Sequence, residues 1–233
     1  MKKKQNNGQQ HQSPESYIKA RARKLPLGTS YISSDWKESG LANILITRKH
    51  VNGNVTVGAY LVDLYCLGVK QCYYFFNLSP HQFDDILTEG DVAIDYNTVH
   101  NILYGAVEYA EELGFKPAKD WSIAEFILEP DDDNVPLVDI EFGRDGKPFF
   151  VPGPGDQQYK IMDILNTLVK NVGIGNFYFD DSFINDANDD DFEDDEEIDE
   201  LDYEHLFEDE KSENIDIEDY IDFEEEKDED KKD

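Results

Sequence analysis

The stretch ANILITRKHVNGNVTVGAYLVDLY, residues 42–65, decides the fold. β-rich runs lie on both sides of Asn52-Gly53, and this dipeptide between such runs is the strongest short signal for a hairpin turn. A two-residue turn there fixes a register in which Ala42 pairs with Asp63. The stretch therefore predicts an antiparallel β-hairpin.

Helices and further strands follow this hairpin. The clearest helix covers residues 96–114, because its apolar residues recur at helical spacing and Gly114 follows them as a stop signal. Ser79 and Gln82 predict the start of another helix, since a serine at the N-cap and a glutamine three residues later form a capping box. The other expected elements are a strand at 71–77, a helix near 119–128, a hairpin formed by 135–142 and 148–151 around Asp145-Gly146, a helix over 156–173 and a strand at 176–179.

This order of elements predicts an α+β domain over residues 31–179. Its sheet is expected to be largely antiparallel, made of two hairpins plus extra strands, and packed with three to four helices. Residues 1–30 are expected to form a basic arm with a short helix that begins at Ser13-Pro14. Four basic residues cover most of this helix's circumference and leave little of it to face a core; they are Lys19, Arg21, Arg23 and Lys24.

Charge is distributed unevenly along the 233 residues, whose formal net charge is −32. Residues 180–233 hold 30 acidic and 4 basic residues, a net charge of −26, whereas residues 1–24 carry a net charge of +6. So dense an acidic block repels itself and cannot bury enough apolar surface to offset chain entropy. We therefore expect residues 180–233 to be a disordered acidic tail.

Apolar residues interrupt this acidic tail at intervals. Acidic–apolar alternation is typical of segments that dock on a partner through a few apolar anchors, while their charge steers the encounter. The expected partner is a basic protein, and the expected anchors are Ile198, Leu201, Phe207, Ile217, Tyr220 and Phe223. The alternative is a tail that only keeps the protein in solution. The basic arm is expected to bind nucleic acid only weakly, because the tail shields it.

Asp63 is the one carboxylate in the most apolar stretch of the chain, residues 58–76. The expected register places Asp63 on the same face of the hairpin as Ile44. A buried carboxylate is either held by hydrogen bonds or positioned to bind a metal ion or a proton. We favour the structural role, because most buried polar groups are satisfied within the fold.

The alternative role for Asp63 is that of a Mg²⁺ ligand, which needs further carboxylates nearby. Glu108, Glu141 and Asp156 are the candidate partners, although the first two are also explained as solvent-facing acids and Asp156 as a helix N-cap. Strands followed by helices, with acids on both, resemble ribonuclease-H-like nucleases. The resemblance implies metal-dependent nuclease activity, but the first acid of those enzymes lies on the first strand, where this chain has none.

Catalytic and cofactor motifs are absent from the sequence, among them GxSxG, HExxH and a phosphate-binding loop. Cys66 and Cys72 are too few for a disulfide framework and indicate a reduced cytosol. No apolar run approaches the roughly 18 residues that indicate a membrane helix. We therefore expect a cytoplasmic, non-enzymatic interaction or regulatory protein that needs no cofactor and contacts no membrane.

Two segments carry a resemblance to other proteins. YLVDLYCLGVK, residues 60–70, and FGRDGKPFFVPGP, residues 142–154, are similar to segments of uncharacterised bacterial proteins. The resemblance covers residues 42–179 and excludes both charged ends. No activity is attached to that group, so the resemblance implies no functional residue.

Overall fold

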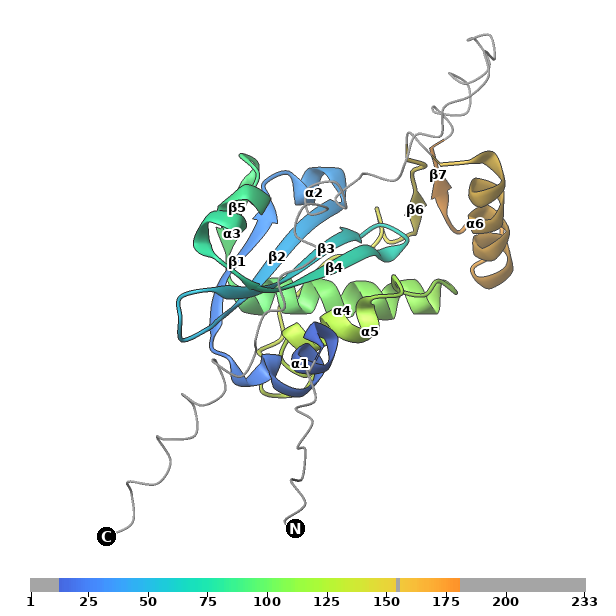
Figure 1. The fold of residues 1–233 in the computed structure, drawn as a ribbon. Helices are drawn as coiled ribbons and strands as arrows, with labels where there is room; N and C mark the ends of the chain where they lie inside the picture. Colours follow the sequence, from blue (N-terminus) through green and yellow to red (C-terminus); the bar gives the residue numbers. More distant parts are fainter. Residues whose placement is uncertain (1–12, 154–155, 181–233) are drawn as a thin grey trace, which may run out of the picture. The chain divides into compact units, whose positions relative to one another are not determined.

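The computed structural model describes residues 13–153 and 156–180 (Figure 1). Over these residues the chain forms an α+β fold whose main sheet has five antiparallel strands in the order β4-β3-β2-β1-β5. The strands are β1 (Leu27–Ser33), β2 (Leu41–Lys49), β3 (Val55–Asp63), β4 (Gly68–Leu78) and β5 (Asp91–Ile94). The predicted fold class is confirmed, while β1 and β5 are strands that the sequence analysis missed.

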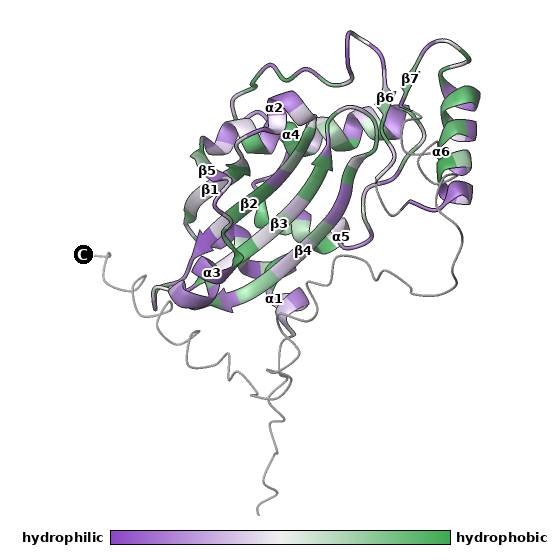
Figure 2. Cartoon of the chain, turned by 90° about the horizontal axis from the view of Figure 1, so that it is seen from above, coloured by the Kyte–Doolittle hydropathy of each residue, from purple (hydrophilic) through white to green (hydrophobic). Residues whose placement is uncertain are grey.

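Helical residues pack against both faces of this sheet: Ile102 lies in the core on the face of Ile44, whereas Phe83 packs beside Leu45 on the opposite face. The helical segments are α1 (Pro14–Arg21) with the 3₁₀ turn η1 (Ala22–Lys24), α2 (Trp36–Ser39), α3 (Pro80–Ile86), α4 (Tyr96–Glu112), α5 (Trp121–Ala124) with the 3₁₀ turn η2 (Glu125–Ile127), and α6 (Gln158–Asn171). α4, α5 and η2 contact the strands, and Figure 2 shows the sheet from its other face, with α4 behind it. The main core lies between these layers and includes Ile44, Tyr60, Ile102 and Ala124. None of the described helices is long and apolar enough to cross a membrane.

Two helix predictions are confirmed. The helix predicted over residues 96–114 is α4, and its apolar stripe is buried in the main core. The predicted capping box at α3 is also present: the Oγ atom of Ser79 accepts a hydrogen bond from the N–H of Gln82, and the Gln82 side chain accepts one from the N–H of Ser79 at 2.9 Å. In both places a short local signal is sufficient, because the cap is satisfied within four residues of the chain.

The β2–β3 hairpin has a three-residue turn, so the predicted two-residue turn is wrong. The N–H of His50 donates to the carbonyl of Asn54 at 2.9 Å, and the N–H of Gly53 donates to the carbonyl of His50 at 3.1 Å. Gly53 has a φ of 89°, the left-handed conformation that closes a three-residue hairpin loop. The register of the two strands is therefore shifted by one residue from the expected one.

This shift exchanges the two faces of the hairpin, because neighbouring side chains of a strand point to opposite faces. Ile44 pairs with Tyr60, and both lie in the main core. Asp63 pairs with Leu41 instead of Ala42. Asp63 therefore lies on the face opposite to Ile44, and not on the same face as we expected.

The compact unit that holds the sheet begins at Tyr17, before the expected boundary at residue 31. Tyr17 and Ile18 of α1 are buried, as are Ala22 and Leu25 after it. The expectation that little of this helix faces a core is wrong, because Tyr17 and Ile18 of the helix are buried and Ile18 lies in the main core. Of the other unit the structure describes only residues 13–16, where the Oγ atom of Ser13 accepts a hydrogen bond from the N–H of Ser16 at 3.3 Å.

The expected second hairpin is present only as a turn. Two reciprocal backbone hydrogen bonds of 2.7 and 3.1 Å join Arg144 and Lys147 around Asp145 and Gly146, and both turn residues have positive φ. Residues 135–142 form no strand, contrary to our prediction. The exposure of residues 137–142 still alternates with a period of two, as in an extended chain whose one face is covered.

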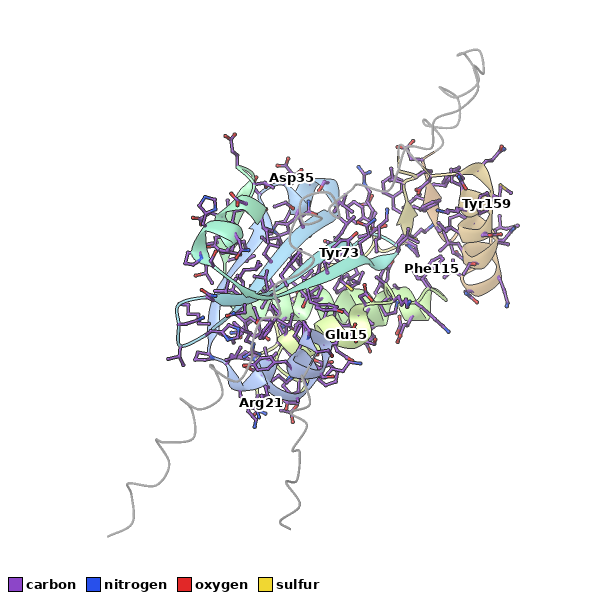
Figure 3. The ribbon with its side chains drawn as sticks, viewed as in Figure 1. Glu15, Arg21, Asp35, Tyr73, Phe115 and Tyr159 are labelled. Carbon is purple, nitrogen blue, oxygen red and sulfur yellow. The ribbon has the colours of Figure 1, made fainter. Side chains whose placement is uncertain are left out.

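A second, smaller core lies around α6. Next to this helix, β6 (Phe149–Phe150) pairs in parallel with β7 (Tyr178–Phe179), whereas we expected residues 148–151 to pair with 135–142. The buried residues of this core are Cys66, Leu113, Phe150, Ile161 and Leu168. Phe115 packs against the same cluster and lies between the end of α4 and α6 (Figure 3). The β3–β4 turn, which contains Cys66, is thus joined to α6.

Candidate functional site

A cleft of about 590 Å³ opens beside the turn that joins β3 to β4. Its walls include Gly40 after α2, Leu64 and Tyr65 of the turn, Thr98 of α4, and most of the segment 138–145. Both segments on which the resemblance to bacterial proteins rests contribute to these walls. The cleft is therefore the place where those two distant parts of the sequence meet.

Asp63 holds the turn in place from its first residue. Its Oδ1 atom accepts hydrogen bonds from the N–H groups of Tyr65 at 2.9 Å and Cys66 at 3.0 Å, and the residue is only 8% exposed. Burial raises the pKa of Asp63, while the charge of Lys70 and the hydrogen bonds from the turn's backbone oppose that rise. The geometry is that of a structural carboxylate, the role that we favoured from the sequence.

Backbone hydrogen bonds join the turn to both neighbouring walls of the cleft. The N–H of Leu64 donates to the carbonyl of Gly40 at 2.8 Å. From the other wall, the N–H of Gly143 donates to the carbonyl of Leu64 at 3.0 Å, and the N–H of Phe149 donates to the carbonyl of Tyr65 at 3.0 Å. These bonds fix the base of the cleft independently of any side chain.

Charged side chains of both signs line the cleft. Its two cations lie against aromatic rings: the Nζ atom of Lys37 is 5.2 Å from the centroid of the Trp36 ring, and the guanidinium of Arg144 is 4.9 Å from that of Phe149. Three exposed carboxylates also line it, and none of them has an ion-pair partner among the described residues; they are Asp139, Glu141 and Asp145. Carboxylates are therefore the charged groups of the cleft that no neighbour engages.

The backbone of residues 137–142 is the most unusual wall of the cleft. Within the described part of the chain, none of its N–H or carbonyl groups takes part in a hydrogen bond. Leu137 is 94% exposed, whereas Ile140 and Phe142 pack against the main core. This segment therefore presents backbone donors and acceptors to solvent while every second side chain anchors it.

Arg48 is a buried charge that the sequence analysis missed. It is 1% exposed, and its Nε atom donates to the carbonyl of Ile127 at 2.7 Å. Its Nη1 atom donates to the carbonyl of Leu25 at 3.0 Å and to Oε1 of Glu129 at 2.8 Å, whereas Nη2 has no partner among the described residues. Arg48 ties β2 to the segments that follow η1 and η2, which is a structural role that nothing in the local sequence pattern indicates.

The four predicted basic contacts of the N-terminal arm differ in the structure. Lys19 and Lys24 are exposed and Arg21 is half-buried. Arg23 is not available as predicted, because its Nε atom donates to the carbonyl of Leu128 at 2.7 Å in a partly buried position. The predicted tail anchors lie outside the described residues; they are Ile198, Leu201, Phe207, Ile217, Tyr220 and Phe223.

The carboxylates of the nuclease alternative do not form a metal site. Glu108 and Glu141 are exposed, while Asp63 is bound to the backbone of its own turn. Over residues 13–153 and 156–180, no three His, Cys, Asp or Glu side chains are grouped so that they could hold a metal ion. The nuclease alternative therefore loses the constellation on which it depended.

The two cysteines are not activated as nucleophiles. Cys66 and Cys72 are both buried. Burial raises the pKa of the Cys66 thiol, and it raises the pKa of Cys72 to about 12 with a further contribution from the charge of Asp120. Both thiols therefore stay protonated at neutral pH, and a thiol is a much weaker nucleophile than a thiolate.

No protein-family model matches the chain, and no curated protein or solved structure matches it. The resemblance of residues 60–70 and 142–154 to bacterial segments therefore stays a prediction. The chemistry of the cleft and the charge of the chain are therefore the features that bear on its function.

Proposed function

We propose that this chain is a non-enzymatic interaction protein that binds a basic protein partner. The observation that carries the proposal is the set of cleft carboxylates without an ion-pair partner in the described residues, Asp139, Glu141 and Asp145. The two cysteines, in contrast, are buried. A cleft of this kind offers recognition by charge and by backbone hydrogen bonds. It offers no activated nucleophile and no metal-holding group within the described residues.

The charge of the whole chain supports the same kind of partner. A formal net charge of −32 attracts basic proteins over a distance of about one Debye length, roughly 8–10 Å at physiological salt. Complementary charge raises the rate of encounter more than it raises affinity. In this proposal the acidic tail brings the basic partner close, and the cleft and the apolar anchors of the tail hold it.

Affinity capture with the full-length chain tests the proposal. The bait is compared with two full-length variants of equal charge change: Asp139→Asn with Glu141→Gln in the cleft, and Asp131→Asn with Asp133→Asn on an exposed segment outside it. We expect the captured proteins to be more basic than the lysate background and to be reduced by the cleft variant alone. A captured set with no excess of basic proteins would overturn the proposal.

The basic arm supports a smaller part of the proposal, a weak and salt-sensitive contact with nucleic acid. Lys19 and Lys24 are exposed, but the net charge of the whole chain opposes any polyanion. We expect the full-length chain to bind a DNA duplex little at low salt, and a chain without residues 181–233 to bind it better. Equal DNA binding by the two chains would remove this part of the proposal.

A further inference from the structure

We infer that residues 137–142 bind an extended peptide with alternating basic residues by adding it as a β-strand to their backbone edge, which has no partner in the described part of the chain. The inference rests on the proposed function, because it names the binding mode and the partner class of the same cleft. It differs from charge attraction alone in requiring main-chain hydrogen bonds at one defined segment.

The backbone of residues 137–142 has unpaired donors and acceptors in the described part of the chain. The N–H and carbonyl groups of extended segments are paired in the ladders of a sheet. In residues 137–142 these groups have no partner within the described part of the chain. In strand addition, backbone groups of this kind supply the affinity, and pockets for alternate side chains supply the specificity.

Contacts with the rest of the fold already hold this segment in position. Ile140 and Phe142 pack against the main core. Before the segment, Nδ2 of Asn101 donates to the carbonyl of Pro136 at 3.0 Å, and after it the N–H of Gly143 donates to the carbonyl of Leu64 at 3.0 Å. A segment fixed at both ends loses little conformational entropy when a peptide binds, so more of the hydrogen-bond energy remains as affinity.

The exposed carboxylates of the segment indicate the charge of its occupant. Asp139 and Glu141 are exposed two residues apart, and Asp145 lines the same cleft. Directly opposed residues of two strands favour opposite charges, so lysine or arginine fits at every second position of the added strand. The acidic tail of this chain is excluded as the occupant by its own charge, since residues 180–233 carry 30 acids and 4 bases.

The size of the site fits a short peptide. Six extended residues span roughly 20 Å at about 3.3 Å per residue. The cleft of about 590 Å³ beside them lies within the usual range of ligand sites, and the rings of Tyr65 and Trp36 are among the groups that line it. The apolar residues between the basic ones would face these rings.

The probe is the peptide acetyl-Gly-Lys-Val-Lys-Val-Lys-Gly-amide, titrated into the full-length ¹⁵N-labelled chain. We expect the amide signals of residues 137–142 to shift and alternate amides among them to become protected from hydrogen exchange, because only one edge of the segment gains a partner strand. The same peptide with glutamate in place of lysine should leave these signals unchanged.

Two controls separate strand addition from unspecific attraction. The variant Asp139→Asn with Glu141→Gln should weaken the titration at residues 137–142 by about two- to thirtyfold, as expected for the loss of two cross-strand charge pairs. The equally charged variant Asp131→Asn with Asp133→Asn should not. N-methylation of the three lysines and N-methylation of the two valines block opposite edges of the peptide, so one of them should abolish binding and the other should preserve it.

The possible results separate this inference from the proposed function. A peptide that binds without changing the signals of residues 137–142 is held elsewhere on the acidic chain, which overturns strand addition and leaves the interaction protein intact. Binding that survives both N-methylation patterns also overturns strand addition. Protection of residues 137–142 that grows with protein concentration in the absence of peptide would overturn the peptide as occupant in favour of a second copy of the chain. A chain that binds neither the lysine peptide nor any basic protein overturns both proposals.

Discussion

Two segments of this chain were both predicted to be strands, and only one of them has partner strands. β3 pairs with β2 on one side and with β4 on the other along its length. Residues 137–142 alternate in exposure, which β3 does not, but they pair with nothing in the described part of the chain. Alternation therefore indicates that one face of an extended segment is covered, as Ile140 and Phe142 are, and not that its edges are paired.

The carboxylates of the two segments differ in the same way. Asp63, at the end of β3, is buried and accepts two backbone hydrogen bonds within its own turn. Asp139 and Glu141 are exposed and have no partner in the described residues. The first carboxylate contributes to the fold, whereas the other two are available to a ligand. The predictions below test this contrast from its largest expected effect to its smallest.

The largest effect is expected from a proline in β3. Ala59 pairs with Leu45 on one side and with Tyr73 on the other. Ala59→Pro removes a ladder hydrogen bond from a central strand, where proline is not tolerated. We expect the variant to lose its cooperative unfolding transition in urea, whereas Ala59→Ser, which keeps the N–H, should retain it. A cooperative transition of normal midpoint in the proline variant would contradict the paired state of β3.

The next effect is expected at Arg48, in β2 beside β3. Arg48→Met leaves the buried carbonyls of Ile127 and Leu25 without their donor and breaks the ion pair with Glu129. We expect the free energy of unfolding to fall by about 3 kcal/mol, since each buried acceptor left unpaired costs about 1–3 kcal/mol. Urea denaturation measures the change.

Glu129→Gln is the matched control for Arg48→Met. Its side chain is 34% exposed and the glutamine oxygen can still accept from Arg48, so we expect a much smaller loss, of less than about 1 kcal/mol. Equal losses in the two variants would show that the carbonyl contacts of Arg48 contribute nothing.

Local signals and long-range contacts explain which parts of this fold could be predicted. The hairpin, α4 and the capping box at Ser79 depend on neighbours within a few residues, and the sequence pattern identified all three. The hairpin register was missed because Asn52-Gly53 fits a two-residue turn, whereas His50 and Asn54 close a three-residue one. β5 was missed because four residues are too few to show a period.

The cleft could not be predicted for a different reason. Its walls come from residues near 36–40, 64–65 and 138–145, which only the folded chain brings together. Tyr65 and Arg144 lie about 80 residues apart, and no spacing in the sequence connects them. Arg48 was equally hidden, because its three acceptors lie far from it along the chain. A local pattern carries no information about such contacts.

A smaller effect is expected when Asp63 loses its acceptor oxygens. Asp63→Ala leaves the N–H groups of Tyr65 and Cys66 without a partner. We expect a loss of about 2 kcal/mol, within the range of about 1–3 kcal/mol for unpaired buried groups. Asp63→Asn keeps an acceptor oxygen and should lose less. An alanine variant as stable as the asparagine variant in thermal or urea melts would contradict the structural role.

The pH dependence of Asp63 sharpens this test. Burial raises the pKa of the folded-state carboxyl above its ordinary value of 3.8, so the folded protein binds more protons than the unfolded one between these two pKa values. The contribution of Asp63 to stability therefore falls as the pH rises from 3.8 through the raised pKa. We expect the unfolding free energy of the native protein relative to Asp63→Asn to decrease over this window. A difference that increases with pH would mean that the backbone donors outweigh burial.

The smallest effect on stability is expected from a proline in residues 137–142. Asp139 is exposed, and its N–H has no hydrogen-bond partner in the described residues, so Asp139→Pro removes a donor that the fold does not use. Proline also favours an extended residue before it, which suits Val138. We expect the free energy of unfolding to change by less than about 0.5 kcal/mol, as for a surface substitution away from special features. Ala59→Pro and Asp139→Pro thus place the same residue in the two segments that were both predicted to be strands, and their urea curves should differ more than those of any other pair. If Asp139→Pro destabilises the chain as strongly as Arg48→Met does, residues 137–142 have partners of their own, and their edge is not free to receive a peptide.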